Sequence, residues 1–329
     1  MAKLRAGLVG LGMMGRHHAR VLGSLDGVEL VAVADPGGDV HGAAGEREVL
    51  GTVEELIAKG LDYCVVAAPT GLHEQIGLLL AEAGVHTMLE KPLASDAAGA
   101  RRVAEAFGSR GLVGAVGHIE RYNPSLQRAR TMIAEGHLGA ILQIVTRRQG
   151  PFPGRIADVG VVKDLATHDI DLTSWVAQRP FERVSAEAAY RSGRAHEDLV
   201  AITGRLQGGT VTSHLVNWLS PMKERVTIIT GERGAFKCDT LSADLTYYAN
   251  GTTTQTWDDV TNFRGVSEGD VVRYAIAKPE PLRTEHEAFR DAVLGKSADI
   301  VTLEQGVRIV EVAEAVLESA ASGSAVRLM

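Results

Sequence analysis

Two groups of residues in this chain have the types and the spacing that proton chemistry requires. The first is Glu90-Lys91-Pro92, which ends a short apolar stretch, residues 86–90, with the composition of a buried strand. Pro92 cannot extend a strand and restricts the residue before it to an extended conformation, so we expect Lys91 to be aimed from the strand end. Its ammonium group can donate hydrogen bonds to a reacting oxygen. The alternative is a solvated lysine at a strand–helix junction.

The second group is formed by Asp164, His168 and Asp171. On one α-helix their spacings of four and three residues place them within about 60° of one another. A histidine titrates near neutral pH, and a neighbouring carboxylate fixes its tautomer and stabilises its charged form. A buried helix with a hydrogen-bonded histidine and a metal site are the alternatives. We expect no metal, because the group contains one histidine and no thiolate.

A glycine-rich turn lies between an apolar stretch at 4–10 and a segment with helical spacing at 13–25. In this G-x-G-x-x-G pattern the first glycine permits a tight turn, the second lets a pyrophosphate approach the backbone, and the third lets helix and strand pack closely. The start of the helix then offers free N–H groups and a partial positive charge to phosphates. The residues expected to bind a dinucleotide here are Gly10, Gly12, Met13, Met14 and Gly15. A tight turn that binds nothing is the alternative.

Asp35 ends the next apolar stretch, residues 28–35. A carboxylate at this point accepts hydrogen bonds from the ribose hydroxyls of NAD and repels the 2′-phosphate of NADP. The following residues, Pro36, Gly37 and Gly38, supply no arginine for that phosphate. We therefore expect NAD as the cofactor, with NADP disfavoured. Alternatively, Asp35 only caps a turn before Pro36.

Strands and helices alternate through the first third of the chain and position these groups. Strands are expected at 4–10, 28–35, 62–68, 86–90 and 112–118, and helices at 13–25, 71–84 and 94–109. Such alternation predicts an α/β fold, an open doubly wound sheet that binds ligands beyond the carboxyl ends of its strands. Lys91 and Asp35 both lie at such ends, so we expect both to face the ligand crevice.

Beyond residue 120 the alternation stops, and the pattern becomes that of antiparallel strands. Strands are expected at 140–149, 182–190, 198–207, 210–218, 224–232 and 235–239, and helices at 162–177, 284–295 and 303–322. Gly208-Gly209 and residues 231–234 are hairpin signals. The sequence thus predicts a Rossmann domain over 1–120 and an α+β substrate-binding and oligomerisation domain with a largely antiparallel open sheet over 121–329. The closing helices can pack back on the first domain.

Composition limits the classes of partner. The 329 residues suit two domains, and the formal charge of −7 argues against nucleic acid or an anionic membrane surface as a partner. No apolar run approaches the roughly 20 residues that cross a bilayer. The two cysteines, Cys64 and Cys238, make a disulfide framework unexpected and suit a reducing compartment, so we expect a cytoplasmic protein.

Five stretches resemble the Gfo/Idh/MocA oxidoreductases, the family named for glucose-fructose oxidoreductase and inositol dehydrogenase. They are GLVGLGMMGRHHARVL, VAVADP, VAAPTGLHEQ, AGVHTMLEKPLA and KDLATHDIDL, and the resemblance extends over essentially the whole chain. It implies that Lys91 is catalytic and binds substrate, and that the helix with Asp164, His168 and Asp171 faces the nicotinamide. On this basis Pro69, Thr70 and His73 are expected along the cofactor groove, where Ala68 and Lys91 are also placed. Glu90, at the strand end, is expected to contact the amide side of the cofactor or to pair with a cationic group. Ala166 departs from the glycine of many relatives, which should affect packing more than chemistry.

The resemblance implies an NAD-dependent dehydrogenase that transfers hydride between a nicotinamide and a secondary alcohol of a sugar. The pKa of a free lysine, near 10.4, is too high for a base at neutral pH. We therefore expect His168, with Asp164 beside it, to move the hydroxyl proton while Lys91 polarises the reacting oxygen. The exchange of these two roles stays open.

The substrate is expected to be a sugar or nucleotide sugar. The stretch around residues 147–169 looks like that of relatives which oxidise nucleotide-activated amino sugars at C3, the UDP-N-acetylglucosamine 3-dehydrogenases. Arg155 could bind a phosphate or carboxylate through two parallel hydrogen bonds. Tyr122 and Asn123 are expected in the same pocket, with domain-junction packing as the alternative for Tyr122. An inositol or free-sugar dehydrogenase is the second candidate.

A candidate from another class is a non-catalytic, NAD-responsive regulator. It predicts loss of the lysine or of the histidine motif, and both are intact in this chain. The resemblance also implies a homodimer or homotetramer.

Overall fold

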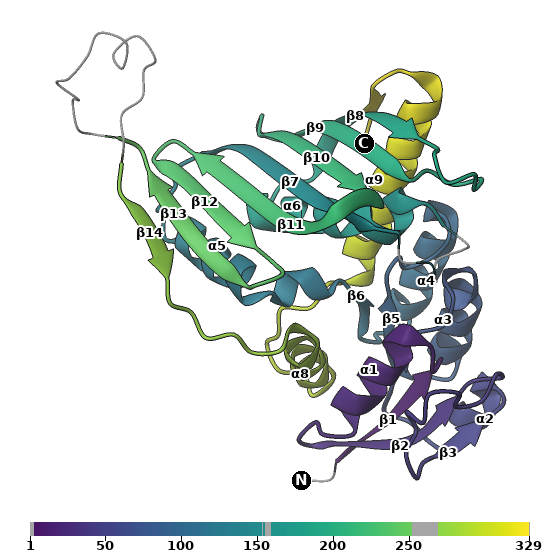
Figure 1. The fold of residues 1–329 in the computed structure, drawn as a ribbon. Helices are drawn as coiled ribbons and strands as arrows, with labels where there is room; N and C mark the ends of the chain where they lie inside the picture. The colour runs from purple at the N-terminus through teal and green to yellow at the C-terminus, as the bar shows by residue number, and fades with distance from the viewer. Residues whose placement is uncertain (1–2, 153, 155–158, 252–268, 329) are drawn as a thin grey trace, which may run out of the picture. The chain divides into compact units, whose positions relative to one another are not determined.

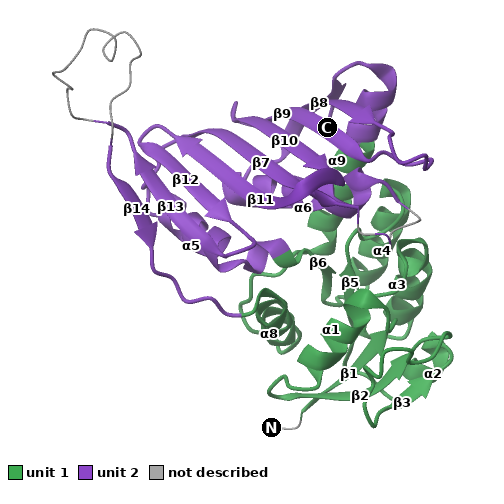
Figure 2. Cartoon of the chain, viewed as in Figure 1, with its two compact units in different colours: residues 1–119, 280–314 green, residues 120–279, 315–329 purple. Residues whose placement is uncertain are grey.

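The computed structural model describes residues 3–152, 154, 159–251 and 269–328. Arg155, one of the predicted substrate residues, lies outside this part of the chain. The chain divides into two compact units, shown in Figure 2: unit 1 comprises residues 1–119 and 280–314, and unit 2 comprises residues 120–279 and 315–329.

Unit 1 is built on a six-stranded sheet with the order β3-β2-β1-β4-β5-β6. Its strands are β1 (Leu4–Val9), β2 (Val28–Ala34), β3 (Glu48–Leu50), β4 (Tyr63–Val66), β5 (His86–Glu90) and β6 (Gly114–Gly117). Each strand pairs with its neighbours in parallel. This is the strand order of a doubly wound dinucleotide-binding fold, as the alternating sequence pattern predicts. Because Val9 pairs with Ala34 and with Val66, the carboxyl ends of the central strands lie at one edge.

Helices cover both faces of this sheet (Figure 1). They are α1 (Met13–Leu22), α2 (Val53–Ile57), the 3-10 turn η1 (Thr70–Leu72), α3 (His73–Glu82), α4 (Ala97–Gly108), α8 (Pro281–Val293) and the first part of α9 (Leu303–Ser322). Local capping explains where two of them begin. Thr52 and Glu55 form a capping box at the start of α2, and Asp96 accepts a hydrogen bond from the Gly99 N–H at the start of α4.

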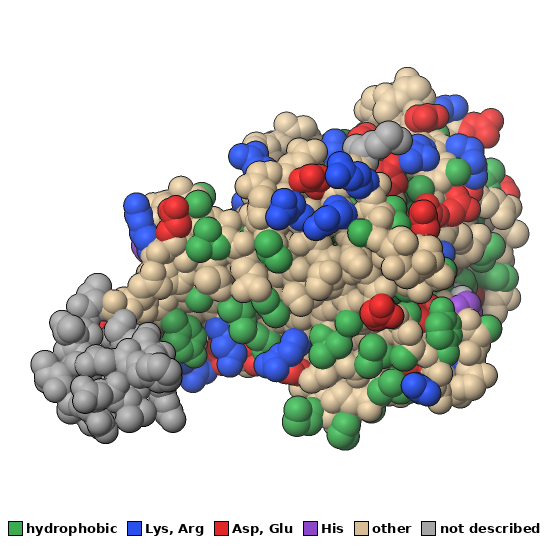
Figure 3. Space-filling model, turned by 90° about the horizontal axis from the view of Figure 1, so that it is seen from above, with side chains coloured by type: hydrophobic (Ala, Val, Ile, Leu, Met, Phe, Trp, Pro, Cys, Tyr) green, Lys and Arg blue, Asp and Glu red, His purple; other side chains and the backbone are tan. Residues whose placement is uncertain are grey.

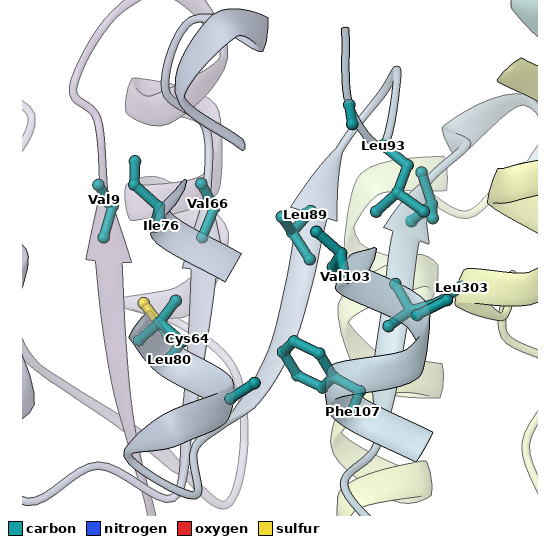
Figure 4. Close-up of a cluster of buried hydrophobic side chains, with 14 of the residues drawn as sticks. Val9, Cys64, Val66, Ile76, Leu80, Leu89, Leu93, Val103, Phe107 and Leu303 are labelled. Atoms are coloured by element: carbon teal, nitrogen blue, oxygen red, sulfur yellow. The ribbon is translucent and has the colours of Figure 1, made fainter. Parts of the chain in front are cut away.

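The core of unit 1 lies on both faces of the sheet. One cluster contains apolar side chains of α3, α4 and the start of α9 packed against the central strands (Figure 4). Among its members, Leu89 of β5, Phe107 of α4 and Leu303 of α9 are almost completely buried. A second cluster contains Phe289 of α8, which contacts Tyr63 edge-on at a centroid distance of 5.5 Å. The closing helices at the end of the chain therefore contribute to the Rossmann core.

Unit 2 contains a nine-stranded sheet with the order β14-β13-β12-β11-β7-β10-β9-β8-β15. The strands are β7 (Ile141–Pro151), β8 (Phe181–Ala189), β9 (Leu199–Leu206), β10 (Val211–Asn217), β11 (Leu219–Gly231), β12 (Gly234–Asp239), β13 (Asp244–Ala249), β14 (Val271–Tyr274) and β15 (Val326–Arg327). Among these described strands, β7 and β10 pair in parallel and the other neighbours pair antiparallel. The prediction of a largely antiparallel sheet is confirmed.

Helices α5 (Pro124–Ala134) and α6 (Thr167–Ala177) pack on one face of this sheet. They bury Leu126 and Met132 from α5, and Leu172 and Trp175 from α6, in one apolar cluster with side chains of the sheet. A 3-10 turn, η2 (Ile119–Tyr122), precedes α5. Burial of this apolar face fixes the register of the strands, because a slip by one residue would turn every buried side chain outward.

No helix in the described part of the chain is long and apolar enough to cross a membrane. On the face of the molecule seen in Figure 3, hydrophobic side chains are interspersed with basic and acidic ones.

Candidate active site

The glycine turn joins β1 to α1, and each of its three glycines has different surroundings. Gly10 has φ +89, and a Cβ there would lie 2.6 Å from the carbonyl oxygen of Ala67. A Cβ on Gly15 would lie 2.0 Å from the carbonyl oxygen of Gly10, so the start of the helix approaches the strand as closely as only glycine allows. Gly12, in contrast, faces open space within 4 Å. This open position fits a pyrophosphate that approaches the backbone.

The start of α1 leaves backbone donors available to such a group. Gly12 is the N-cap, no side chain caps the helix, and its first turn contains no acidic residue. The N–H groups and the positive end of the helix dipole are therefore open to an anion. Met13, the first helical residue, is 41% exposed.

Asp35 follows β2 and holds the glycine turn by hydrogen bonds. Its Oδ2 accepts from the N–H of Leu11 at 2.7 Å, and its Oδ1 accepts from the N–H of Gly37 at 2.8 Å. Asp35 therefore caps the turn at Pro36, which was predicted from the sequence as the alternative to binding of the ribose. The side chain is only partly buried, and a carboxylate has about four lone-pair sites, so capacity remains for ribose hydroxyls.

The Glu-Lys-Pro segment begins at the last residue of β5, next to the ends of β4 and β6. Lys91 is partly buried, and the Lys91–Pro92 peptide bond is cis. Glu90 is 7% exposed, and its Oε2 accepts from the N–H of Lys91 at 3.1 Å. Its Oε1 lies 2.9 Å from Nε2 of His18 on α1. Burial disfavours the charge of Glu90, but the His18 contact and the positive charge of Lys91 outweigh it and lower the pKa of Glu90.

His73, which the family resemblance places along the cofactor groove, has both ring nitrogens bound to backbone. Its Nδ1 lies 2.8 Å from the carbonyl oxygen of Pro92 and its Nε2 lies 2.9 Å from that of Ala68. Burial lowers the pKa of His73 despite these two contacts. The imidazole thus links the loop after β4 to the Glu-Lys-Pro segment. The neighbouring Pro69 is exposed and Thr70 is partly buried, so their contact with a cofactor stays a prediction.

The second candidate group lies in unit 2, and its helix differs from the expected one. Residues Val162–Ala166 form a π-helical turn, and the regular α6 starts at Thr167. A π turn contains more residues than an α turn, so Asp164 and His168 do not have the α-helical i, i+4 relation that the sequence argument assumed. Oε1 of Glu197 accepts from the N–H of Val162 at 2.9 Å and holds the start of this turn.

The acidic residues of α6 are paired inside unit 2. Asp171 is completely buried and accepts from Nε of Arg121 at 3.0 and 2.9 Å. His168 is 9% exposed, whereas Asp164 is partly buried. Lys91 belongs to unit 1 and His168 to unit 2, so their meeting at one nicotinamide stays a prediction.

A buried charge network that we did not predict lies beside this helix. Arg148 of β7 donates to Asp169 at 3.0 Å and to Glu120 at 2.8 Å, and Arg225 lies 3.4 Å from Glu120. Burial raises the pKa of Asp169 even though Arg148 opposes it. Burial also favours a higher pKa for Glu120, but the positive charges of Arg148 and Arg225 outweigh burial and lower the pKa of Glu120. The signal was present in the alternation along β7, which buries Thr146 and Arg148 on the helix-covered face.

Two further predicted substrate residues are largely engaged within unit 2. Asn123 caps α5: its Oδ1 accepts from the N–H and hydroxyl of Ser125, and its Nδ2 donates to the carbonyl of Thr240. Tyr122 is 6% exposed. Contact of either side chain with a substrate stays a prediction.

Comparison with known proteins identifies both parts of the chain. Residues 4–118 match the oxidoreductase family described as an NAD-binding Rossmann fold, and residues 130–328 match its C-terminal alpha/beta domain. The UDP-N-acetylglucosamine 3-dehydrogenase of Acidithiobacillus ferrooxidans is 29% identical over 299 residues, 89% of this chain and 90% of that protein. The solved structure of that enzyme, GnnA, superposes with a TM-score of 0.85 at 25% identity and covers 98% of this chain and 99% of its own.

Two other similarities concern the substrate and the cofactor. An inositol 2-dehydrogenase of Cereibacter sphaeroides is 35% identical over 202 residues, which is 59% of each chain. GenD2, from gentamicin A biosynthesis and solved in complex with NAD, has a TM-score of 0.82 at 25% identity and covers all of this chain and 97% of its own. The family resemblance of the sequence is thereby confirmed. The chain belongs to the GFO/IDH/MocA oxidoreductase family, with an NAD-binding Rossmann domain followed by the family's alpha/beta domain.

Proposed function

We propose that the protein is an NAD-dependent dehydrogenase that transfers hydride between a nicotinamide and a secondary alcohol of a sugar, namely C3 of a nucleotide-activated sugar. One observation within unit 1 carries this proposal. The open Gly12 position and Lys91 lie at the carboxyl ends of β1 and β5, strands of one parallel sheet that β4 separates. This edge is where doubly wound folds bind ligands, so a dinucleotide there would extend toward an amine donor.

Similarity over nearly the whole chain to a UDP-N-acetylglucosamine 3-dehydrogenase supports the nucleotide sugar. The inositol 2-dehydrogenase has the higher identity but over 59% of the chain, and inositol or a free sugar is therefore the second candidate. Arg155, as a phosphate ligand, would favour the nucleotide sugar. The NAD-responsive regulator is the third candidate, and it requires cofactor binding without turnover.

In the proposed reaction the bound nicotinamide supplies or accepts the hydride. Lys91 donates a hydrogen bond to the reacting oxygen and stabilises negative charge on it. His168 takes the hydroxyl proton during oxidation and returns it during reduction, and Asp164 acts beside it. Tyr122, Asn123 and Asp171 remain in the proposal as residues around the sugar.

A substrate panel tests the proposal directly. Reduction of NAD and of NADP is followed with UDP-N-acetylglucosamine and related UDP-sugars, with inositols, and with free hexoses. We expect turnover with a UDP-sugar and NAD. Turnover with inositol alone would replace the nucleotide sugar by the second candidate. Cofactor binding without turnover of any compound would favour the regulator.

Two substitutions test the residues that carry the chemistry. Lys91→Ala and His168→Ala are each expected to lower kcat about 100-fold or more, because each removes a group that acts on the reacting oxygen or its proton. Lys59→Ala and His137→Ala are matched controls at the surface. Lys59 forms an ion pair with Glu48, and His137 lies near Glu135. Unimpaired turnover in either test variant would remove that residue from the mechanism.

Asp35 supports NAD as the cofactor, and its replacement tests that choice. Asp35→Ala removes the acceptor for the ribose and the charge that repels a 2′-phosphate. We expect kcat/KM with NAD to fall about tenfold or more and the preference over NADP to shrink, whereas Asp26→Asn, at an exposed site, should change neither. An unchanged ratio of NAD to NADP efficiency in Asp35→Ala would contradict the assignment.

A second copy of the chain is the proposed partner. Strand β10 alternates between buried Thr212, His214 and Val216 and exposed Val211 and Leu215, while α5 and α6 cover the other face of the sheet. Such an outward face can bury its apolar side chains against the same face of another copy. Sedimentation equilibrium should give a homodimer or homotetramer, and a Leu215→Lys variant should shift it toward the monomer.

A further inference from the structure

We propose that His18 and His286 are positioning residues that hold the Glu90 carboxylate in one place and thereby set the direction in which Lys91 leaves β5. The inference rests on the proposed function, because it takes Lys91 as the group that acts on substrate. Neither histidine belongs to the glycine turn or to the predicted catalytic group.

The four residues form one chain of contacts inside unit 1. The N–H of Lys91 donates to Oε2 of Glu90 at 3.1 Å, Oε1 of Glu90 lies 2.9 Å from Nε2 of His18, and Nδ1 of His18 lies 2.8 Å from Nε2 of His286. The exposed fractions of Glu90, His18 and His286 are 7%, 0% and 1%. The chain therefore connects β5, α1 and α8 with almost no contact with water, where each hydrogen bond is strong and each missing one costly.

The hydrogen positions follow from the partners. A carboxylate can only accept, so His18 donates to Glu90 from Nε2. With that hydrogen on Nε2, the Nδ1 of His18 accepts in the 2.8 Å contact, which requires a hydrogen on Nε2 of His286. Nδ1 of His286 has no hydrogen-bond partner among the described residues, so leaving it unprotonated avoids a buried, unpaired N–H donor. Both rings are thus assigned as Nε2–H tautomers, and burial lowers the pKa of His286, which disfavours a second hydrogen on that ring.

His286 matters because it decides which tautomer His18 adopts. Without a donor facing Nδ1, His18 is free to move its hydrogen to that nitrogen, and Nε2 then has no hydrogen for Glu90. Among the described residues, the carboxylate would then keep the N–H of Lys91 as its donor. The carboxyl carbon of Glu90 also lies 3.2 Å from where a Cβ on Gly117 would be, so the backbone of β6 closes one side of its site. A shift of Glu90 would therefore move Lys91 with it.

The two amide replacements of His286 provide a matched pair of variants. In glutamine the side-chain nitrogen can reach the position of Nε2, so His286→Gln keeps the donor to His18. In His286→Asn the amide reaches only the position of Nδ1 and the donor is lost. His17→Asn is the control on α1, because His17 is the next residue to His18 and does not take part in the chain of contacts.

We expect kcat of His286→Asn to fall about tenfold with little change in KM, and that of His286→Gln to stay within about twofold of the wild type. The pH profile adds a second readout. The titratable groups next to Glu90 are His18, which donates a hydrogen bond to it, Lys91, whose charge lowers its pKa, and His73, on which the charge of Glu90 acts. Loss of the His18 donor removes a contact that lowers the pKa of Glu90, so the acid limb of kcat/KM should move to higher pH in His286→Asn only.

A measurement without substrate decides the tautomers. In protein labelled with ¹⁵N-histidine, the ring shifts of His18 and His286 should both report Nε2–H, and those of His18 should change in His286→Asn but not in His286→Gln. Identical behaviour of the two variants, with His18 shifts and the acid limb at wild-type values, would overturn the inference. Because these spectra need no turnover, a failed substrate panel would reject the proposed function and leave the tautomer assignment to be decided independently.

Discussion

At the residue scale, two glycines of the glycine turn have different roles. Gly15 allows close packing within the protein, whereas Gly12 leaves room for a ligand. The position of Gly15 is filled by the backbone of Gly10, whereas the position of Gly12 is open. The sequence pattern alone predicted close packing at Gly15 and phosphate approach at Gly12, because both roles depend on residues that are close together in the chain. The two substitutions to alanine should therefore have different consequences.

We predict that Gly12→Ala leaves folding stability near the wild-type value and raises the dissociation constant of NADH about tenfold or more, because the methyl group occupies the approach of the pyrophosphate. Gly15→Ala should instead lower the free energy of unfolding by about 1–3 kcal/mol, since the methyl group overlaps backbone. Fluorescence titration and urea denaturation measure the two effects. Undiminished NADH affinity in Gly12→Ala would contradict the phosphate assignment.

Other residue roles could not be predicted from the sequence. The contact between His18 and His286 joins residues 268 positions apart, and no local pattern connects them. The sequence argument placed Asp171 on one stripe of a helix with Asp164 and His168, but periodicity does not reveal that Asp171 forms a buried ion pair with Arg121. Charged residues on a helix face indicate a functional site and a buried ion pair equally well.

At the scale of elements, the patterns predicted most of the strands and helices, but helices α2 and α5 and strands β3 and β13 were not predicted. The six strands expected in the second part of the chain are all present. Each of these segments is long enough, or alternates regularly enough, to be distinguished from a turn. Strands β14 and β15 have four and two residues and depend on their partner strands for definition. The π turn at Val162–Ala166 was also missed, because it is stabilised from outside the helix, by Glu197.

The charge network around Arg148 gives a prediction that depends on pH. Arg148→Met leaves Glu120 and Asp169 buried without their shared partner, and we expect a loss of about 3–5 kcal/mol of folding stability near neutral pH. Both carboxyl groups should then have a pKa above the unfolded value. The folded state would bind more protons than the unfolded one, so the loss should shrink as the pH falls from 7.5 toward 5.

Arg147→Met is the matched control for this change. Arg147 is the next residue of β7, points to the opposite face, is half exposed and pairs with Glu224. Its replacement should cost less than about 1 kcal/mol at either pH. Urea denaturation at both pH values measures the difference, and equal effects of the two variants would contradict the account of the network.

At the scale of the whole molecule, the two cysteines report on the integrity of both cores. Cys64 lies in unit 1 and Cys238 in unit 2, and both are completely buried. Burial raises the pKa of Cys238 to about 12 and raises that of Cys64 further. Neither thiol should react with Ellman's reagent in the native protein, and two should react in guanidinium. Fast reaction of one thiol in native protein would show that its unit opens.

The order of the two kinds of sheet was predictable from the sequence, and the packing of the closing helices on the first domain was foreseen only as a possibility. An amphipathic helix shows that it covers a core without showing which one. Residues 280–314 belong to unit 1, although the chain has by then passed through most of unit 2. Phe289, Val301 and Leu303 are almost completely buried there.

Because residues 280–314 complete unit 1 only after most of unit 2 has been made, the order of synthesis affects folding. When the ribosome has made the first 120 residues, the nucleotide-binding sheet still lacks α8 and the start of α9, and the apolar surface that they cover remains in water. The nascent unit cannot reach its final stability until residues 280–314 have been translated. A truncated gene that ends after β6 should therefore yield a protein that aggregates instead of an independent NAD-binding module.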